Sequence, residues 1–211
     1  MQDNPWIDWV EKIRAIAQSG IAYSEGDERA KFDLERYHQL QTIAHEMTAL
    51  LAGAPKRKVD SYFLPEKGYT TPKLDLRAGV FRDGKVLMVK ERSDGCWALP
   101  GGWADVCEPP SAGVEREVLE ESGYRARAGK LVAVRDVHRH AYHPRNPHHI
   151  YKMLFLCQLE GGEARSNIEI SDIDFFPLDQ LPELSEGRTI AEDIHLLKAH
   201  LDDISLPTIF D

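Results

Sequence analysis

The first quarter of the chain carries apolar residues at helical spacing. Asn4 can cap a helix and Pro5 suits its first position, and we expect this helix to end at Gly20. A second helix is predicted from Asp27 to Leu51, with apolar positions that again step by threes and fours. These positions are Trp6, Trp9, Val10, Ile13, Ile16 and Ala17 in the first helix and Leu34, Tyr37, Leu40, Ala44, Met47 and Leu51 in the second.

The predicted helical pair leaves two arrangements open. It either packs on its own domain or packs against a second subunit. Two helices alone can hardly bury two tryptophans and a long apolar stripe, which favours the second subunit. Residues 53 to 73 then combine prolines and glycines with the basic cluster Lys56-Arg57-Lys58, a pattern typical of a solvated linker. We therefore expect a helical domain with its linker over residues 1–66 and a second domain over residues 67–211.

From Lys73 the apolar pattern changes to period two, which predicts strands. The dipeptide Asp83-Gly84 separates the first two strands and is a strong hairpin signal. Gly161-Gly162 predicts a further turn, and Thr189 with Glu192 predicts a capping box that opens a final helix. The expected strands are 76–82, 85–91, 97–99, 131–137, 151–159 and, more weakly, 168–176. The fold class is therefore α+β, with a mixed sheet between two helices and an N-terminal helical domain.

Composition narrows the choice of partners and compartment. The chain has 26 Lys and Arg against 35 Asp and Glu, a net charge of -9, which disfavours nucleic acid as a partner. Its three cysteines are far apart and form neither a disulfide framework nor a zinc pattern. No apolar signal segment or membrane-length apolar run occurs. We expect a cytoplasmic protein that does not insert into membranes.

One stretch, from Leu99 to Tyr124, concentrates candidate chemistry. A Gly-Gly loop precedes a helix that we expect to start near Pro110 and to close at Gly123. Glu117, Glu120 and Glu121 fall at positions i, i+3 and i+4, so they share one helix face. Like charges at this spacing repel unless a cation neutralises them. Because Mg²⁺ binds carboxylates and shares its shell with substrate phosphates, the pattern predicts a Mg²⁺ site for phosphate chemistry. Val118 and Leu119 are expected to pack on the sheet.

The segment from Gly102 to Tyr124 resembles the box of the Nudix hydrolases. It keeps Gly102, Glu108 and the run Arg116-Glu-Val-Leu-Glu-Glu-Ser-Gly123 at the family's spacing. Tyr124 departs from the family, which usually has an aliphatic residue there, and we expect this side chain to pack in the core. The resemblance implies an α/β/α sandwich over residues 73–205. It also implies hydrolysis of a nucleoside diphosphate linked to another group, X.

The same resemblance implies roles for the box residues. Glu117, Glu120, Glu121 and the Gly102 carbonyl would bind Mg²⁺ or Mn²⁺. Arg116 would hold a box glutamate by a charge-assisted bond, or it could pair with Glu120 alone on the surface. Glu108 would make either a metal-side or a structural contact. The catalytic set is then Glu117, Glu120 and Arg116 with a general base.

The general base stays open between a box glutamate and a carboxylate on a later loop. Glu163 and Glu169 are the later candidates, and Glu169 is preferred. The alternative for Glu169 is an exposed position at a strand edge.

A basic loop after the box is the candidate for substrate selection. Residues 135–152 contain five of the nine histidines, and loops on a rigid scaffold often carry specificity. We expect substrate contacts from His138, His140 and Lys152, together with Arg77 and Arg92 from earlier strands. A zinc site from His138, His140 and His143 is an alternative that lacks a completing cysteine or carboxylate, and a solvated loop is another.

The N-terminal segments 5–9 and 33–37 resemble a Nudix subgroup with a helical N-terminal domain. That subgroup acts on nucleoside diphosphates linked to X, including CDP-choline and ADP-ribose, and tends to dimerise through the added helices. The chain lacks the proline that typical ADP-ribose enzymes place after the box, since Arg139 and His140 stand there. Alternatives are nucleoside triphosphate cleansing, RNA end processing, and a non-catalytic nucleotide sensor, which the intact box and acidic charge disfavour.

Overall fold

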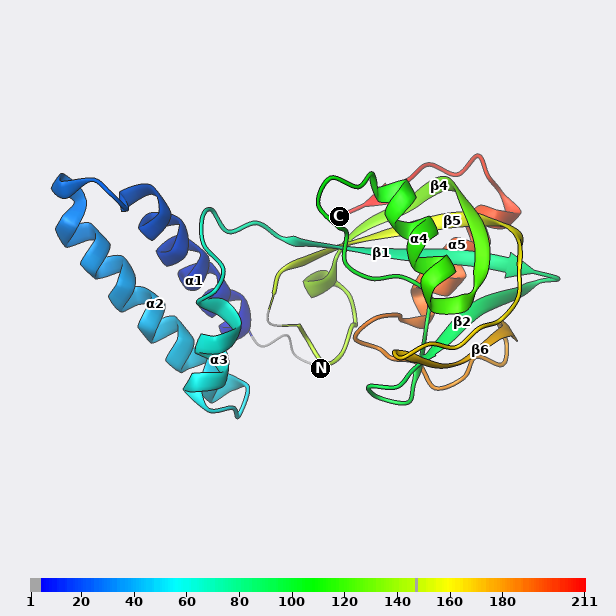
Figure 1. The fold of residues 1–211 in the computed structure, drawn as a ribbon, viewed down its shortest axis with the longest axis horizontal. Helices are drawn as coiled ribbons and strands as arrows, with labels where there is room; N and C mark the ends of the chain where they lie inside the picture. Colours follow the sequence, from blue (N-terminus) through cyan, green and yellow to red (C-terminus); the bar gives the residue numbers. More distant parts are fainter. Residues whose placement is uncertain (1–4, 147) are drawn as a thin grey trace. The chain divides into compact units, whose positions relative to one another are not determined.

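The computed structural model describes residues 5–146 and 148–211 and divides into two compact units, Met1–Thr71 and Pro72–Asp211 (Figure 1). The expected division after residue 66 falls inside the first unit. That unit is helical, with α1 (Pro5–Ser24), the short 3₁₀ turn η1 (Glu28–Ala30), α2 (Lys31–Leu51) and α3 (Lys56–Phe63).

Two expectations for the helical unit are wrong. Helix α1 continues past Gly20 to Ser24. A Cβ at position 20 would lie 2.5 Å from the Tyr37 ring, so this glycine permits close packing of α2 and does not end the helix. The expected linker contains α3, whose Val59 and Phe63 are buried with Ala49 of α2. The basic cluster forms the first turn of α3, where Lys56 pairs with Asp60 at 2.7 Å.

The helical unit leaves much of its apolar surface uncovered. Trp6 and Trp9 contact each other edge to face and are each about half exposed. Phe32, Ile43 and Leu50 on α2 are also exposed. Within the residues that the structure describes, no helix is long and apolar enough to cross a bilayer.

The second unit is built on a mixed sheet. Its strands are β1 (Lys73–Arg82), β2 (Lys85–Glu91), β3 (Trp97–Ala98), β4 (Tyr124–Asp136), β5 (Ile150–Gly162), β6 (Ile170–Pro177) and β7 (Ile209–Phe210). The strand order is β3-β2-β1-β5-β4-β7, and β6 pairs with β2. The β1–β5 and β4–β7 pairs are parallel, and the remaining pairs are antiparallel.

Helices α4 (Pro110–Ser122) and α5 (Ala191–Asp202) cover opposite faces of this sheet (Figure 1). Val114 and Val118 of α4 join a core on one face, and Ile194 and Leu197 of α5 join a core on the other. Strand β5 alternates between the two, with Phe155 in the first core and its neighbour Leu156 in the second. The α+β class and the α/β/α sandwich are confirmed.

Several local predictions in this unit are confirmed. Asp83 and Gly84 both have positive φ, at 52° and 76°, as a tight hairpin turn requires. Helix α4 begins at Pro110 and closes at Gly123, which is left-handed. Tyr124 is buried in the core beside Phe175.

Other local predictions are wrong because tertiary contacts override the local pattern. Leu119 is exposed, and Val114 takes its place beside Val118, one helical turn away. Gly161 and Gly162 do not turn the chain but lie within β5, where the backbone of Gly162 closely approaches Gly123. The Thr189–Glu192 capping box does not form.

The start of α5 uses different partners from those expected. Thr189 Oγ1 accepts a hydrogen bond from the Leu99 amide at 2.9 Å, which ties the glycine loop to this segment. Asp193 caps the helix instead, by accepting from the Ile190 amide at 3.3 Å.

Candidate active site

The glycine loop lies directly on strand β1. The Leu76 amide donates to the Gly102 carbonyl at 2.8 Å, and the Ala78 amide donates to the Pro100 carbonyl at 2.9 Å. Gly101 has φ of 144°, and a Cβ there would lie 1.9 Å from the Leu76 carbonyl oxygen, so only glycine fits. A Cβ on Gly102 would lie 3.1 Å from Glu117 Oε1. The loop backbone therefore touches the acidic face of α4.

Arg116 organises this face. Its Nη1 donates to Glu117 Oε1 and to Glu120 Oε2, each at 2.9 Å, and its Nη2 donates to Glu108 Oε2 at 3.1 Å. The bond to Glu108 is the main reason that the pKa of Arg116 is raised. Arg116 thus holds two box glutamates and not Glu120 alone, and Glu108 makes a structural contact to it.

Burial makes two of the box carboxylates costly to ionise. Glu121 Oε2 accepts from the Gly101 amide at 2.8 Å, yet burial raises the pKa of Glu121 to about 7. Burial also raises the pKa of Glu117, and Arg116 counteracts it. A cation at this face would favour the ionised form of both groups.

The donor set suits Mg²⁺ or Mn²⁺, because it consists of carboxylate oxygens and one carbonyl. The Gly102 carbonyl already accepts from Leu76, which leaves it a second lone pair. Among the described residues, the oxygens of Glu117, Glu120 and Glu121 do not all lie within 4.8 Å of one another. Arg116 holds the first two and Gly101 holds the third. Glu120 is largely exposed, so its side chain has room to turn inward.

A buried charge network lies beneath the loop. Arg77 Nε pairs with Asp75 Oδ1 at 3.0 Å, and its Nη1 donates to the Leu99 carbonyl at 3.1 Å. Lys152 Nζ pairs with Asp75 and donates to the Arg188 carbonyl at 2.7 Å. Burial lowers the pKa of Lys152. Although burial opposes it, the two cations hold the pKa of Asp75 below its ordinary value.

This network corrects one expectation about substrate contacts. The Lys152 side chain is 1% exposed, so it supports the floor of the site and does not reach a ligand. Arg77 is also buried and paired with Asp75, although it lines the cavity described below.

The remaining predicted residues do not gather at one place. His140 Nε2 contacts Asp211 at 2.9 Å, whereas His138 lies beside His149 and Asp136. The alternative zinc set of His138, His140 and His143 is therefore wrong, because the structure groups His138 with other ligands. His143 lines the cavity.

Arg92 and Glu169 lie together near the end of α4. The Arg92 amide donates to the Glu169 carbonyl at 2.8 Å, and its Nε donates to Asn167. Asn167 in turn donates to the Glu120 carbonyl at 2.8 Å. Glu169 is exposed on the segment that reaches α4 beside Glu120.

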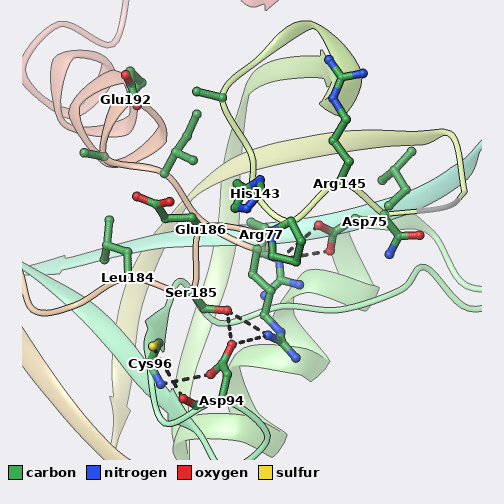
Figure 2. A pocket seen from close by; sticks show the side chains of 18 of the residues that line it. Asp75, Arg77, Asp94, Cys96, His143, Arg145, Leu184, Ser185, Glu186 and Glu192 are labelled. Atoms are coloured by element: carbon green, nitrogen blue, oxygen red, sulfur yellow. Dashed lines mark hydrogen bonds and ion pairs between the residues drawn. The ribbon is translucent and has the colours of Figure 1, made fainter. Parts of the chain in front are cut away.

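A cavity of about 1230 Å³ opens beside the glycine loop (Figure 2). Gly102, Trp103 and Arg77 line it on the side of the acidic helix. His143 and Arg145 come from the histidine-rich loop, and the segment 182–192 supplies the opposite wall. The cavity therefore joins the box to the loop that we expected to select the substrate.

The sequence interpretation missed one cluster at this cavity. Arg188 Nη1 donates to Asp94 Oδ2 at 2.9 Å, and Ser185 donates to the same oxygen at 2.6 Å (Figure 2). Arg188 also pairs with the buried Glu91 at 3.3 Å. Glu91 was detectable, since it is a charge at an apolar position of an alternating strand. Arg188 carries no local signal, because its carboxylate partners Glu91 and Asp94 lie more than ninety residues away.

Comparisons with known proteins agree with this geometry. Residues 4–63 match the family model described as a UDP-X-like, N-terminal oligomerisation domain, and residues 74–197 match that of the NUDIX domain. The YjhB protein of Bacillus subtilis (strain 168), provisionally named an ADP-ribose pyrophosphatase, is 38% identical over 206 residues, covering 98% of this chain and 97% of that protein.

Two crystal structures are also similar. A UDP-X diphosphatase is 31% identical with a TM-score of 0.62, and both chains are covered completely. An ADP-ribose pyrophosphatase from Streptococcus suis 89-1591 is 41% identical with a TM-score of 0.62, covering 67% of this chain and 100% of that one. With its box, its sandwich and its N-terminal helices, this chain belongs to the Nudix hydrolase family and is a Nudix pyrophosphohydrolase.

Proposed function

We propose that this protein uses Mg²⁺ or Mn²⁺ to hydrolyse the diphosphate bond of a nucleoside diphosphate linked to X. The products are a nucleoside monophosphate and a phosphorylated X. ADP-ribose is the first substrate to test, because two of the similar proteins carry the ADP-ribose pyrophosphatase name. The UDP-X diphosphatase and the resemblance to CDP-choline enzymes make UDP- and CDP-linked compounds the next choices.

One observation carries this proposal: the acidic face of α4 meets, at Gly102, a cavity large enough for a dinucleotide-sized ligand. A diphosphate placed at Gly102 would have the box glutamates on one side and the cavity on the other. The nucleoside and X would then occupy the cavity, and the scissile bond would face the glutamates.

Glu117, Glu120, Glu121 and the Gly102 carbonyl are the groups that would hold the divalent cation. When bound, it would neutralise charge on the phosphoryl oxygens and make a bound water a stronger nucleophile. Arg116 restricts Glu117 and Glu120 to a few orientations and so acts as a positioning residue.

Protein groups of the cavity would bind the organic part of the substrate. Trp103 is about half exposed at its wall and offers a flat apolar face for a nucleobase. Arg145 and His143 can donate to a phosphate or a ribose hydroxyl. His138 and His140 lie on the same loop and stay candidates for indirect support, since neither lines the cavity.

Glu169 is our candidate for the general base. It is exposed, and its segment is fixed to α4 through the Asn167 bond to Glu120. Arg92 is hydrogen-bonded to the same segment, so it would contact the substrate only from the side of the site where Glu169 lies. A box glutamate is the alternative base, and Glu169→Gln separates the two. If this variant loses turnover but binds metal as before, Glu169 is supported as the general base. If it keeps full activity, Glu169 is not the base.

We also propose that the protein is a homodimer through its N-terminal helices. The matched oligomerisation domain and the exposed apolar residues of α1 and α2, including both tryptophans, support this assembly. Its three free cysteines suit a reducing compartment such as the cytoplasm.

The test is a panel of possible substrates with chromatographic identification of products. ADP-ribose, UDP-glucose, CDP-choline, 8-oxo-dGTP and capped RNA would each be incubated with Mg²⁺, with Mn²⁺ and with chelator. We expect metal-dependent release of a nucleoside monophosphate from a diphosphate-linked compound. Release of pyrophosphate from the triphosphate alone would contradict the proposal and favour triphosphate cleansing.

A further inference from the structure

A cluster of metal-binding side chains lies apart from the box, at the junction of β4 and β5. Asp136, His138 and His149 each offer one ligand atom, and these atoms all lie within 4.8 Å of one another. All three residues are half-buried. Among the described residues, this is the one group of three such side chains that are so close.

The sheet register explains why the three meet. Asp136 is the last residue of β4 and the antiparallel partner of Tyr151. His138 lies in the 3₁₀ turn Val137–Arg139 that follows β4, and His149 directly precedes β5, so the paired strand ends bring their rings together, with centroids 5.3 Å apart. His149 Nε2 lies 3.1 Å from Asp136 Oδ1. The paired ends of β4 and β5 thus anchor the two segments that carry the histidines.

We propose that Asp136, His138 and His149 form a second cation site, which binds a divalent transition metal such as Zn²⁺. Two imidazoles and a carboxylate are typical zinc ligands, and water would complete the coordination. This donor set differs from the all-oxygen set of α4, which suits Mg²⁺ and Mn²⁺.

The surroundings of His138 favour a metal ligand. Burial and the neighbouring His149 lower the pKa of His138. His138 is also hydrogen-bonded to the Asn146 backbone, and Asp136 Oδ1 accepts from the His138 amide at 3.0 Å. Such bonds fix a ligand's orientation before the metal arrives. Arg145, which donates to the His138 carbonyl, adds a positive charge that weakens binding.

A bound metal would connect the end of β4 to the start of β5. The segment between them contributes His143, Arg145 and Asn146 to the cavity. The second site would therefore stabilise one wall of the cavity without touching the acidic helix. This inference concerns metal binding alone and does not depend on the proposed reaction.

The test is a titration of Zn²⁺ into the full-length protein in excess Mg²⁺, with binding measured by calorimetry. Mg²⁺ occupies any all-oxygen site but competes poorly for imidazole. We expect one equivalent of Zn²⁺ to bind and to slow hydrogen exchange of residues 138–146. His138→Ala and His149→Ala should each weaken binding at least tenfold. His195→Ala, which removes an exposed histidine of α5, should bind as the unmodified protein does.

A conservative variant guards against a folding artefact. Asp136→Asn keeps an acceptor for the His138 amide but loses the charge, and it should also weaken Zn²⁺ binding about tenfold. Absence of binding by the unmodified protein would overturn the proposal. So would equal affinities across all variants, because they would place the Zn²⁺ elsewhere.

Discussion

The acidic face of α4 and the Asp136–His138–His149 cluster are two candidate cation sites with opposite origins. The first collects its ligands within five consecutive residues of one helix, Glu117 to Glu121, and adds a glycine loop. The second collects its ligands from the end of β4 and from the segments next to β4 and β5, which strand pairing brings together. In the first site Arg116 offsets the like charges of Glu117 and Glu120 by bonding both, whereas in the second the three ligand atoms already lie within 4.8 Å of one another. A site encoded in one helix is thus visible in sequence, and a site encoded in strand pairing is not.

The largest expected effect concerns the rate of turnover and tests the acidic face of α4. Glu120→Gln should reduce kcat about 10³-fold, because it removes a negative ligand from the acidic face while Glu120 is too exposed to matter for folding. Glu115→Gln is the matched control on the same helix, since its side chain accepts from the Ala128 amide on β4 and does not belong to the Glu117–Glu120–Glu121 face. Steady-state kinetics on the best panel substrate provide the measurement. A well-folded Glu120→Gln variant with ordinary kcat would show that the acidic face is not catalytic.

The next effect concerns the floor beneath the first site. Lys152→Met should lower the free energy of unfolding by about 3 kcal/mol, because it leaves Asp75 with only one of its two buried cationic partners. Lys198→Met breaks an exposed ion pair with Asp202 and should cost under about 1 kcal/mol. Urea unfolding of both variants would measure the difference. Equal losses would mean that the buried network contributes no more than a surface pair.

In metal-free protein, the free energy of unfolding should depend on pH through Glu121 of the acidic face. The folded state keeps a proton on Glu121 up to about pH 7, whereas the unfolded chain loses it near pH 4.5. Because the folded state binds more protons in this window, the free energy of unfolding should fall by about 2 kcal/mol as pH rises from 4.5 to 7. Glu121→Gln should remove this contribution, and Glu115→Gln should keep it. The free energy of unfolding would be measured against pH by denaturation in chelator. If it falls as steeply for Glu121→Gln as for the unmodified protein, the assignment to Glu121 is wrong.

The smallest effect concerns the orientation of the box glutamates. Arg116→Lys keeps the charge but cannot hold Glu108, Glu117 and Glu120 with one planar group. We expect the Mg²⁺ concentration for half-maximal activity to rise about tenfold. Arg127→Lys, on the exposed side of β4, should leave it unchanged. If both variants behave alike, Arg116 contributes charge and not geometry.

The sequence by itself determined what is local. Period-two strands, the Asp83-Gly84 hairpin and a helix closed by Gly123 follow from backbone preferences within a few residues. The carboxylate face of α4 follows from helical periodicity, and so does the position of Arg116 beside it. The resemblance to the Nudix box adds a function to this pattern because all of its residues lie in one short segment, Gly102 to Tyr124.

Only the tertiary structure decided what depends on neighbours distant in sequence. The sequence around Gly20 predicts a helix end, but Tyr37 packs against this glycine and the helix continues. The sequence around Lys152 predicts a substrate ligand, but the side chain is buried in an ion pair with Asp75. His138 lies beside His149 and not His140 because the pairing of β4 with β5 brings together the segments at their ends. Burial and strand pairing bring together residues that no local pattern relates, and these contacts determine the cavity wall, the buried charges and the second cation site.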